Sequence, residues 1–421
     1  MCSVFSFIPV STDLLLYKAR NTHKEVNTMQ SISMPIGKAN WALSALPPLA
    51  LYIHFPWCIK KCPYCDFNSH AQKGALPEQP YIAALLADLE SCLPLMWGRP
   101  ISSIFMGGGT PSLFSAEAIN QLLEGIRARV RLHPDAEITL EANPGTFESE
   151  KFAGYRAAGI TRLSIGIQSF NAEHLQALGR VHDDKEAHRA IEIAHQHFDN
   201  FNLDMMYALP KQTLAEALLD IRTAIACKST HLSAYHLTLE PNTLFHRYPP
   251  ALPDEDCSAD MSDAIEAELA AAGFEHYETS AFAQPKRQAK HNLNYWQFGD
   301  YLGIGAGAHA KISFPDKIIR QMRYKQPTEY LQKMATGSAV QTEEQITLEQ
   351  LPFEFMLNAL RLTGGFDLSL FEERTGLPLT KAIHQIEKAV ADGLLERQLN
   401  HIQPTLRGQR FLNTLLERFL P

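Results

Sequence analysis

Three cysteines that lie close together provide the clearest chemical signal in the chain. Cys58, Cys62 and Cys65 have the spacing C-x3-C-x2-C and follow directly after an apolar segment. Three thiolates on one loop can hold three irons of a [4Fe–4S] cluster and leave the fourth iron without a protein ligand. S-adenosylmethionine can chelate such an open iron, and electron transfer from the cluster can then cleave its sulfonium to give a 5′-deoxyadenosyl radical.

Two other roles for these cysteines stay open at this point. A structural zinc ion needs four ligands, and His54 or His70 could supply the fourth. The Cys62-Pro-Tyr-Cys65 segment alone resembles a glutaredoxin active site, which exchanges thiols, although that role leaves Cys58 unexplained. The remaining cysteines are scattered, as is typical of a protein from a reducing compartment without a disulfide framework: Cys2, Cys92, Cys227 and Cys257.

Polar and glycine residues follow several later apolar segments at equivalent positions. The turn Gly107-Gly108-Gly109-Thr110 exposes its backbone, so a ligand can approach it closely. Glu141, Gln168 and Asp204 lie in or directly after the next three apolar segments. Each alone is more often a strand-end cap or an ion-pair partner. If the segments are successive parallel strands, however, these side chains converge on one cavity at the rim of a barrel.

The elements that must position these residues alternate between strand and helix patterns from about residue 49 onward. This alternation predicts an α/β fold, namely a partial (β/α)6 barrel. The predicted strands are 50–54, 102–106, 138–141, 162–166, 202–206, 231–239 and 276–280. The predicted helices are 78–93, 116–129, 148–157, 185–197, 215–226 and 259–272.

The last part of the chain has a different pattern, which predicts a winged-helix-like α+β domain. Helices are predicted over 351–362, 368–374, 379–392 and 407–420, and extended segments over 394–397 and 401–404. The mixed charge of residues 381–392 favours a structural or docking role over nucleic-acid reading. The expected organisation is a disordered extension (1–46), the barrel (47–282), a connecting region (283–346) and this domain (347–421).

Composition and charge exclude several classes of protein. The chain has 421 residues, of which 45% are hydrophobic, so a large core is assured. Its net charge is −8 (38 − 46), which argues against a general nucleic-acid binder. No apolar run is long enough for a membrane span, and the start of the chain lacks the basic region of a secretory signal. We therefore expect a cytoplasmic protein, with a mitochondrial presequence as the less favoured alternative.

Two further motifs fall in the expected connecting region. Gly303-Ile-Gly305-Ala-Gly307-Ala-His309 resembles a dinucleotide fingerprint but opens no βαβ unit, so we expect a loop that lines the same cavity. His291 begins the string HNLNYW. From the residues alone, it is expected to be a surface-loop histidine beside aromatic residues that plug the open barrel.

Several strings together resemble the radical S-adenosylmethionine superfamily: YIHFPWC, KCPYCDF, GGGTPS, EANPG, GIQSF, LGRVH, NLDM and HNLNYW. Within it, the chain from about residue 49 to the C-terminus resembles the HemW group, related to oxygen-independent coproporphyrinogen III dehydrogenases. The resemblance implies that Cys58, Cys62 and Cys65 ligate the [4Fe–4S] cluster. It also implies an S-adenosylmethionine site lined by Tyr52, Tyr64, Gly108, Gly109, Thr110, Glu141, Gln168, Arg180 and Asp204.

The function implied by the resemblance is that of a haem chaperone, which binds haem and transfers it to acceptor haemoproteins, including respiratory ones. His291 begins the string that matches the group's proposed haem-binding motif. The resemblance therefore implies that its imidazole can bind haem iron, with Tyr295 and Trp296 packing on a face of the porphyrin. The dehydrogenases carry a further cysteine two residues beyond the last cluster ligand, where this chain has Phe67, and their extended N-terminal region has no evident counterpart here. Oxidative decarboxylation of coproporphyrinogen is therefore the alternative function, and a homodimer is compatible with either.

Overall fold

The computed structural model of this protein describes residues 41–146 and 148–421, and a twelve-stranded sheet forms its centre. Six neighbouring strands of this sheet run parallel in chain order. They are β1 (Leu49–Phe55), β4 (Ile101–Gly108), β5 (Leu132–Ala142), β6 (Arg162–Gln168), β7 (Phe201–Tyr207) and β8 (His231–His236). The predicted partial (β/α)6 barrel is confirmed, and the last of these strands ends three residues earlier than expected.

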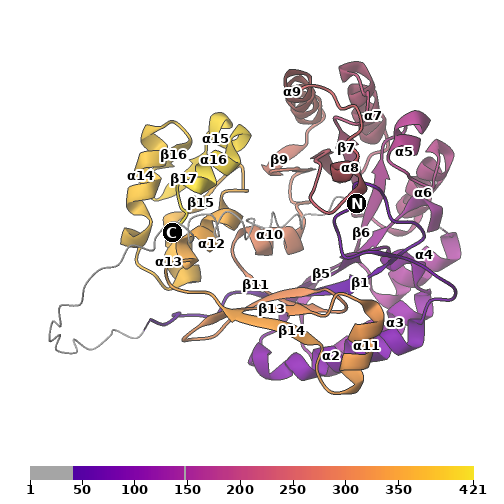
Figure 1. The fold of residues 1–421 in the computed structure, drawn as a ribbon, viewed down its shortest axis with the longest axis horizontal. Coiled ribbons are helices and arrows are strands. Elements are labelled where there is room, and N and C mark those ends of the chain that lie inside the picture. The colour runs from indigo at the N-terminus through magenta and orange to yellow at the C-terminus, as the bar shows by residue number, and fades with distance from the viewer. Residues whose placement is uncertain (1–40, 147) are drawn as a thin grey trace.

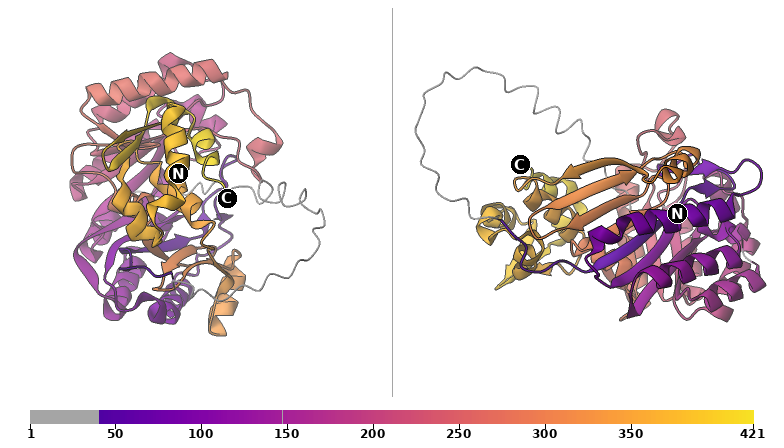
Figure 2. Two further views of the ribbon diagram at one scale, coloured as in Figure 1. Left: turned by 90° about the vertical axis from the view of Figure 1, so that its left-hand side faces the viewer. Right: turned by 90° about the horizontal axis from the view of Figure 1, so that it is seen from below.

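Helices connect these strands and cover the outer face of the curved sheet, as Figures 1 and 2 show. They are α2 (Glu78–Met96), α3 (Ala116–Arg129), α4 (Ser149–Ala158), α5 (Ala172–Ala177), α6 (Asp184–His197) and α7 (Leu214–Ala226). Local sequence fixes where some of them begin. At the start of α6, Asp183 and Glu186 form a reciprocal capping box, which satisfies backbone N–H groups that have no partner within the helix.

The segment 283–346, expected as a connecting region, contributes strands to the same sheet. β11 (Asp300–Ile304) pairs parallel with β1, and β12 (His309–Ser313), β13 (Ile318–Arg323) and β14 (Val340–Gln345) continue the sheet antiparallel. α11 (Pro327–Ala335) connects β13 to β14. Some charged side chains of these strands are buried as ion pairs; Lys311, for example, contacts Asp300 in the interior. Because such charges interrupt the apolar pattern by which a strand is recognised, the sequence did not predict these strands.

The opposite edge of the sheet is closed by short antiparallel strands. After β8 come α8 (Leu244–Arg247) and α9 (Glu255–Ala271), and then β9 (Glu275–Glu278) and β10 (Ala281–Ala283). β10 pairs antiparallel with β8, and β9 pairs with β10. α10 (Lys290–Trp296) then leads back to β11, so the chain passes from the edge formed by β9 and β10 to the far side of β1.

The C-terminal part forms a helical unit with a three-stranded antiparallel sheet, as the winged-helix-like pattern predicts (Figure 1). Its helices and strands are α12 (Leu351–Ala359), β15 (Phe366–Asp367), α13 (Leu368–Thr375), α14 (Ile383–Ala391), β16 (Leu395–Gln398), β17 (His401–Pro404), α15 (Leu406–Arg410) and α16 (Leu412–Glu417). The single predicted helix 379–392 is a short 3-10 turn followed by α14, and the predicted helix 407–420 is divided into α15 and α16.

The beginning of the described chain packs on this C-terminal unit. The indole nitrogen of Trp41 donates a hydrogen bond to the carbonyl of Thr375 at 2.8 Å, and Leu43 is buried in the apolar core of the unit. The expected disordered extension therefore does not reach residue 46; residues 1–40 lie outside the described part. No helix within residues 41–146 and 148–421 is both long and apolar enough to span a bilayer.

Candidate cluster and cofactor site

The three cysteines lie on a loop at the carboxyl end of β1. Short strands β2 (Trp57–Cys58) and β3 (His70–Ala71) pair with each other and hold the two ends of the loop together. Cys58, Cys62 and Cys65 are free thiols, each half-buried. A guanidinium nitrogen of Arg180 lies 3.8 Å from the Cys62 sulfur, and the Ser69 hydroxyl lies 3.5 Å from the Cys65 sulfur. The loop thus presents three thiols at the rim of the barrel.

Burial favours the protonated form of two of these thiols. Burial raises the pKa of Cys58 to about 11 and also raises the pKa of Cys65, because a thiolate loses hydration there. A coordinated metal reverses this preference, since it stabilises the thiolate directly. Among the described residues no three His, Cys, Asp or Glu side chains converge as ligands of a single ion. The three thiols by themselves are one ligand short of the four that a structural zinc ion needs.

The glycine turn after β4 packs closely against the cysteine loop. Gly108 has a φ of +107°, and a Cβ there would lie 2.3 Å from the ring of His54. A Cβ on Gly109 would lie 2.5 Å from the carbonyl oxygen of Trp57. Gly109 donates its N–H to the carbonyl of Phe55, and Thr110 donates to that of Trp57. The two glycines are therefore needed for close packing of the turn against the cysteine loop, before any role in ligand binding. The same turn places Thr110 next to Cys58.

Two buried carboxyl groups face the interior of the rim. Glu141 lies in β5 and accepts a hydrogen bond from the N–H of Gly108 at 3.1 Å. Burial, and then the nearby carboxylate of Asp204, raise the pKa of Glu141 to about 8. Asp204 in β7 accepts hydrogen bonds from Ser164 and Asn202 at 3.0 and 2.8 Å. Neither acid forms an ion pair with a cation among the described residues, so the two are suited to a positively charged ligand, such as a molecule with an amino and a sulfonium group.

This acidic pair predicts a pH-dependent stability. The folded chain holds the Glu141 proton more tightly than the unfolded chain does, so stability falls as pH rises from about 4.5 to about 8. Without S-adenosylmethionine, we expect Glu141→Gln to raise the Tm by several degrees near pH 8.5 and to change it little near pH 5, as a thermal unfolding scan can measure. The matched control Glu150→Gln replaces an exposed acid of α4. A Tm difference that is the same at both pH values contradicts this account.

Gln168 provides a second sign that a ligand belongs here. It is fully buried, it has a φ of +69°, and neither atom of its amide finds a hydrogen-bond partner among the described residues. A strained backbone and an unsatisfied buried amide are both costly, and they occur together mainly at binding sites. The side chain is therefore available to a polar ligand inside the barrel, in agreement with its predicted place in the S-adenosylmethionine site.

Arg180 connects the cysteine loop to the carboxyl ends of the strands. It donates hydrogen bonds to the Asn143 side chain at 2.6 Å and to the Gly166 carbonyl at 2.7 Å, in addition to its contact with Cys62. Asn143 in turn donates to the Thr110 hydroxyl at 2.9 Å. Asn143 was not among the predicted site residues. Its signal was its place between Glu141 and a proline in the string EANPG, directly after a strand.

The two predicted tyrosines lie on different walls of the site. The Tyr52 hydroxyl in β1 lies 2.9 Å from Nδ1 of His54 and has its pKa raised by burial and by Glu141. Tyr64 lies within the cysteine loop, is buried, and packs against Phe245. Hydrogen bonds, packing or electrostatic effects thus connect eight of the nine residues predicted for the S-adenosylmethionine site to one another or to the cysteine loop. The ninth, Gln168, has its amide beside Gly166, whose carbonyl accepts a hydrogen bond from Arg180.

His291 lies apart from that site. It belongs to α10 and has no exposed surface. One ring nitrogen lies 2.8 Å from the Ser103 hydroxyl and the other lies 3.2 Å from the Tyr295 hydroxyl, while the ring stacks on Phe105. Burial lowers its pKa to about 3. Both ring nitrogens of His291 are therefore engaged. The aromatic residues beside it fill the inside of the barrel, as the sequence suggested, but His291 itself is buried in a helix and does not lie on a surface loop.

Comparison with known proteins then places this site in a family. The sequence matches the family model described as "Radical SAM superfamily" over residues 52–224, and the one described as "HemN C-terminal domain" over residues 346–411. The Escherichia coli (strain K12) protein named heme chaperone HemW is 48% identical over 377 residues, which cover 89% of this chain and 99% of that protein. The chain belongs to the HemW family.

Further comparisons agree with this HemW assignment. The Haemophilus influenzae protein named heme chaperone HemW is 49% identical over 381 residues, which cover 89% of this chain and 98% of that protein. A solved structure described as coproporphyrinogen III oxidase (HemN) from Escherichia coli, a radical SAM enzyme, has a TM-score of 0.76 and covers 89% of this chain and 90% of its own, with 24% sequence identity. This likeness establishes the radical SAM fold.

Proposed function

We propose that this protein is a haem chaperone that carries a [4Fe–4S] cluster and S-adenosylmethionine and transfers haem to acceptor haemoproteins, including respiratory ones, in the cytoplasm. The single observation that carries the proposal is the similarity to proteins named heme chaperone HemW over nearly their whole length. Phe67 supports it, because the related dehydrogenases have a cysteine at this position. That residue is at the edge of a cavity and contributes no further thiol to the loop.

The residues of the rim divide the binding of the cofactors between them. Cys58, Cys62 and Cys65 hold the cluster, which supplies one-electron chemistry when S-adenosylmethionine is bound to it. Glu141 and Asp204 offer negative charge to the cationic parts of S-adenosylmethionine, and Gln168 offers both a donor and an acceptor. Tyr52, Tyr64 and the turn from Gly108 to Thr110 shape the walls, while Arg180 fixes Cys62 and Asn143 relative to each other.

Binding of haem iron by His291 requires a conformational change. For His291 to ligate iron, its nitrogens must exchange their contacts with Ser103 and Tyr295 for the metal. Such an exchange implies a movement of α10, which packs on β1, β4 and β11. If His291 serves as the iron ligand, haem binding is expected to be slow and to change the environment of the aromatic residues of the motif.

The proposal is tested on the full chain after anaerobic reconstitution of the cluster. Ferric haem is titrated into one portion, and another portion is assayed for conversion of coproporphyrinogen III to protoporphyrinogen with S-adenosylmethionine and a reductant. We expect one haem per chain and no porphyrinogen turnover. Turnover would establish the dehydrogenase activity instead, and the absence of haem binding would remove the chaperone function. Transfer is followed by the appearance of absorbance in an added apo-haemoprotein.

A further inference from the structure

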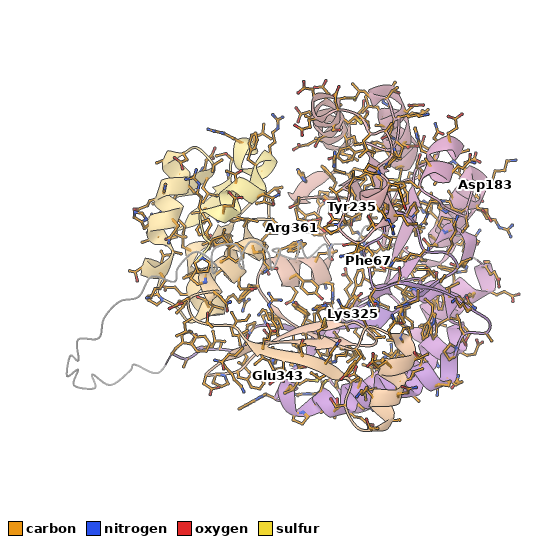
Figure 3. The ribbon with its side chains drawn as sticks, in the orientation of Figure 1. Phe67, Asp183, Tyr235, Lys325, Glu343 and Arg361 are labelled. Atoms are coloured by element: carbon orange, nitrogen blue, oxygen red, sulfur yellow. The ribbon has the colours of Figure 1, made fainter. Side chains whose placement is uncertain are left out.

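A cavity of about 520 Å³ lies beside the cysteine loop and shares Tyr52 with the cofactor site described above. Its volume falls within the range of roughly 300–1,000 Å³ that is typical of cofactor and small-molecule sites. Its lining includes Tyr52 and His54 of β1, Tyr301 of β11 and Gly307 in the turn before β12. Phe67 and Lys325, which Figure 3 labels near the centre of the molecule, belong to its lining.

One wall of this cavity is aromatic. Tyr52, Tyr295 and Tyr301 line it, and the rings of Tyr295 and Tyr301 lie with their centroids 4.5 Å apart. Tyr52 in turn stacks on Phe105 at 6.3 Å. Aromatic rings of this kind offer flat apolar surface to a conjugated ring system. Tyr295 belongs to the HNLNYW motif, so the motif reaches this cavity through its tyrosine although His291 itself does not line it.

Two histidines line the cavity, and their surroundings differ. His54 is buried, and its ring nitrogens lie 2.9 Å from the Tyr52 hydroxyl and 2.9 Å from the Asn68 carbonyl. His309, the first residue of β12, is exposed to the cavity. Surrounding protein atoms and then the positive charge of Lys325 lower the pKa of His309 to about 4. Its imidazole is therefore neutral near pH 7, which is the form that binds a metal.

The charges around His309 are positive. Besides Lys325, they are Arg320 and Arg323, which pair with Glu354 and Asp88 respectively. Lys325 has no carboxylate within ion-pair distance among the described residues and lines the cavity itself. The acids of the cavity, Asp66 and Glu240, act electrostatically on each other and lie near Lys61 of the cysteine loop. The side of the cavity that carries His309 therefore suits a ligand with carboxylate groups.

We propose that this cavity receives a metal tetrapyrrole, with His309 as a ligand of its iron, the tyrosine wall against its ring, and Lys325 as the partner of a carboxylate substituent. The inference rests on the proposed haem-chaperone function and assigns its ligand site. It places the cargo directly beside the cysteine loop, because Lys61, Asp66, Phe67 and Asn68 of that loop line the same cavity. Cluster and cargo thus share one segment of backbone.

The part of the cysteine loop around Asn68 is also hydrogen-bonded to the turn that precedes His309. The Asn68 amide donates hydrogen bonds to the carbonyls of Ala306 and Lys325 at 2.9 and 2.8 Å. A Cβ on Gly307 would lie 2.3 Å from the Asn68 amide nitrogen, so only glycine permits this approach. These contacts hold the turn before His309 against the cysteine loop, and they keep the imidazole at the cavity wall.

The assignment is tested by titrating ferric haem into the cluster-loaded full chain while recording the haem absorbance spectrum. We expect His309→Gly to lose the spectrum of histidine-ligated haem and to bind haem about tenfold or more weakly. Added imidazole is expected to restore the spectrum, a response that a merely structural role would not produce. Metal-free protoporphyrin IX is expected to bind the variant within about twofold of the unaltered protein, because it makes no iron–histidine bond.

Two matched variants complete the test. His384→Ala removes an exposed histidine of α14 and is expected to leave the haem spectrum unchanged. Lys325→Met is expected to weaken haem binding about threefold without changing the spectrum. An unchanged spectrum in His309→Gly, or loss of the ligated spectrum in His291→Ala alone, overturns the assignment while the haem-binding function stands. If the unaltered protein binds no haem at all, both the assignment and the function fail.

Discussion

Replacing Cys58, Cys62 and Cys65 together by alanine is expected to reduce the iron and sulfide content of the reconstituted protein from about four of each per chain to near zero. The three thiols are free and lie on one loop at the rim of the barrel. Without them no thiolates remain at this position to bridge the protein to iron. Anaerobic reconstitution followed by iron and sulfide analysis and an absorbance spectrum measures the effect.

The matched control is a double change at Cys227 and Cys257, which lie away from the loop and are also free. Their replacement by alanine is expected to leave the iron and sulfide content unchanged. The rival thiol-exchange function predicts the reverse dependence, namely activity in an iron-free protein that is lost with Cys62 and Cys65. If the triple variant keeps its iron and sulfide, the cluster assignment is wrong.

Removing the buried carboxylate of Asp88 is expected to lower the free energy of unfolding by about 3–5 kcal/mol, the range for breaking a buried ion pair. Asp88 lies in α2, and its carboxylate is 3.3 Å from the guanidinium of Arg323 with almost no exposure of either side chain. It also accepts hydrogen bonds from the N–H of Gly305 at 3.1 Å and from the Tyr330 hydroxyl at 3.0 Å. Asp88→Ala leaves the arginine charged and buried without its partner.

Urea unfolding of Asp88→Ala beside the unaltered protein measures this loss. The control Glu268→Ala breaks an exposed pair with Arg222 and is expected to lower the stability far less, because solvent screens this pair. In the double variant with Arg323→Met, much of the lost stability is expected to return, because no unpaired buried charge remains. If Asp88→Ala costs no more than Glu268→Ala, the buried pair does not stabilise the fold. The same variant is expected to loosen the turn at Gly305 that precedes His309.

The order of the barrel could be predicted because its signals are local. The six parallel strands are short segments rich in apolar residues, and several of the helices between them have their own start signal, such as the capping box at Asp183. The cysteine spacing is also local, so one loop was expected to carry all three thiols. Glu141 and Asp204 were expected to meet because parallel strands end at one rim, and the electrostatic effect of Asp204 on Glu141 agrees.

The sequence by itself thus determined the barrel, the cysteine loop and the family, because each of these depends on patterns among residues that are close together in the chain. Only the tertiary structure decided which polar residues are buried and with what partners. Arg323 and Asp88 are 235 residues apart in the chain, and their pairing allows a charged strand to enter the core. His291 became inaccessible through contacts with Ser103 and Phe105 of β4, whereas His309 came to a cavity wall. Long-range contacts of this kind leave no periodic trace in the sequence.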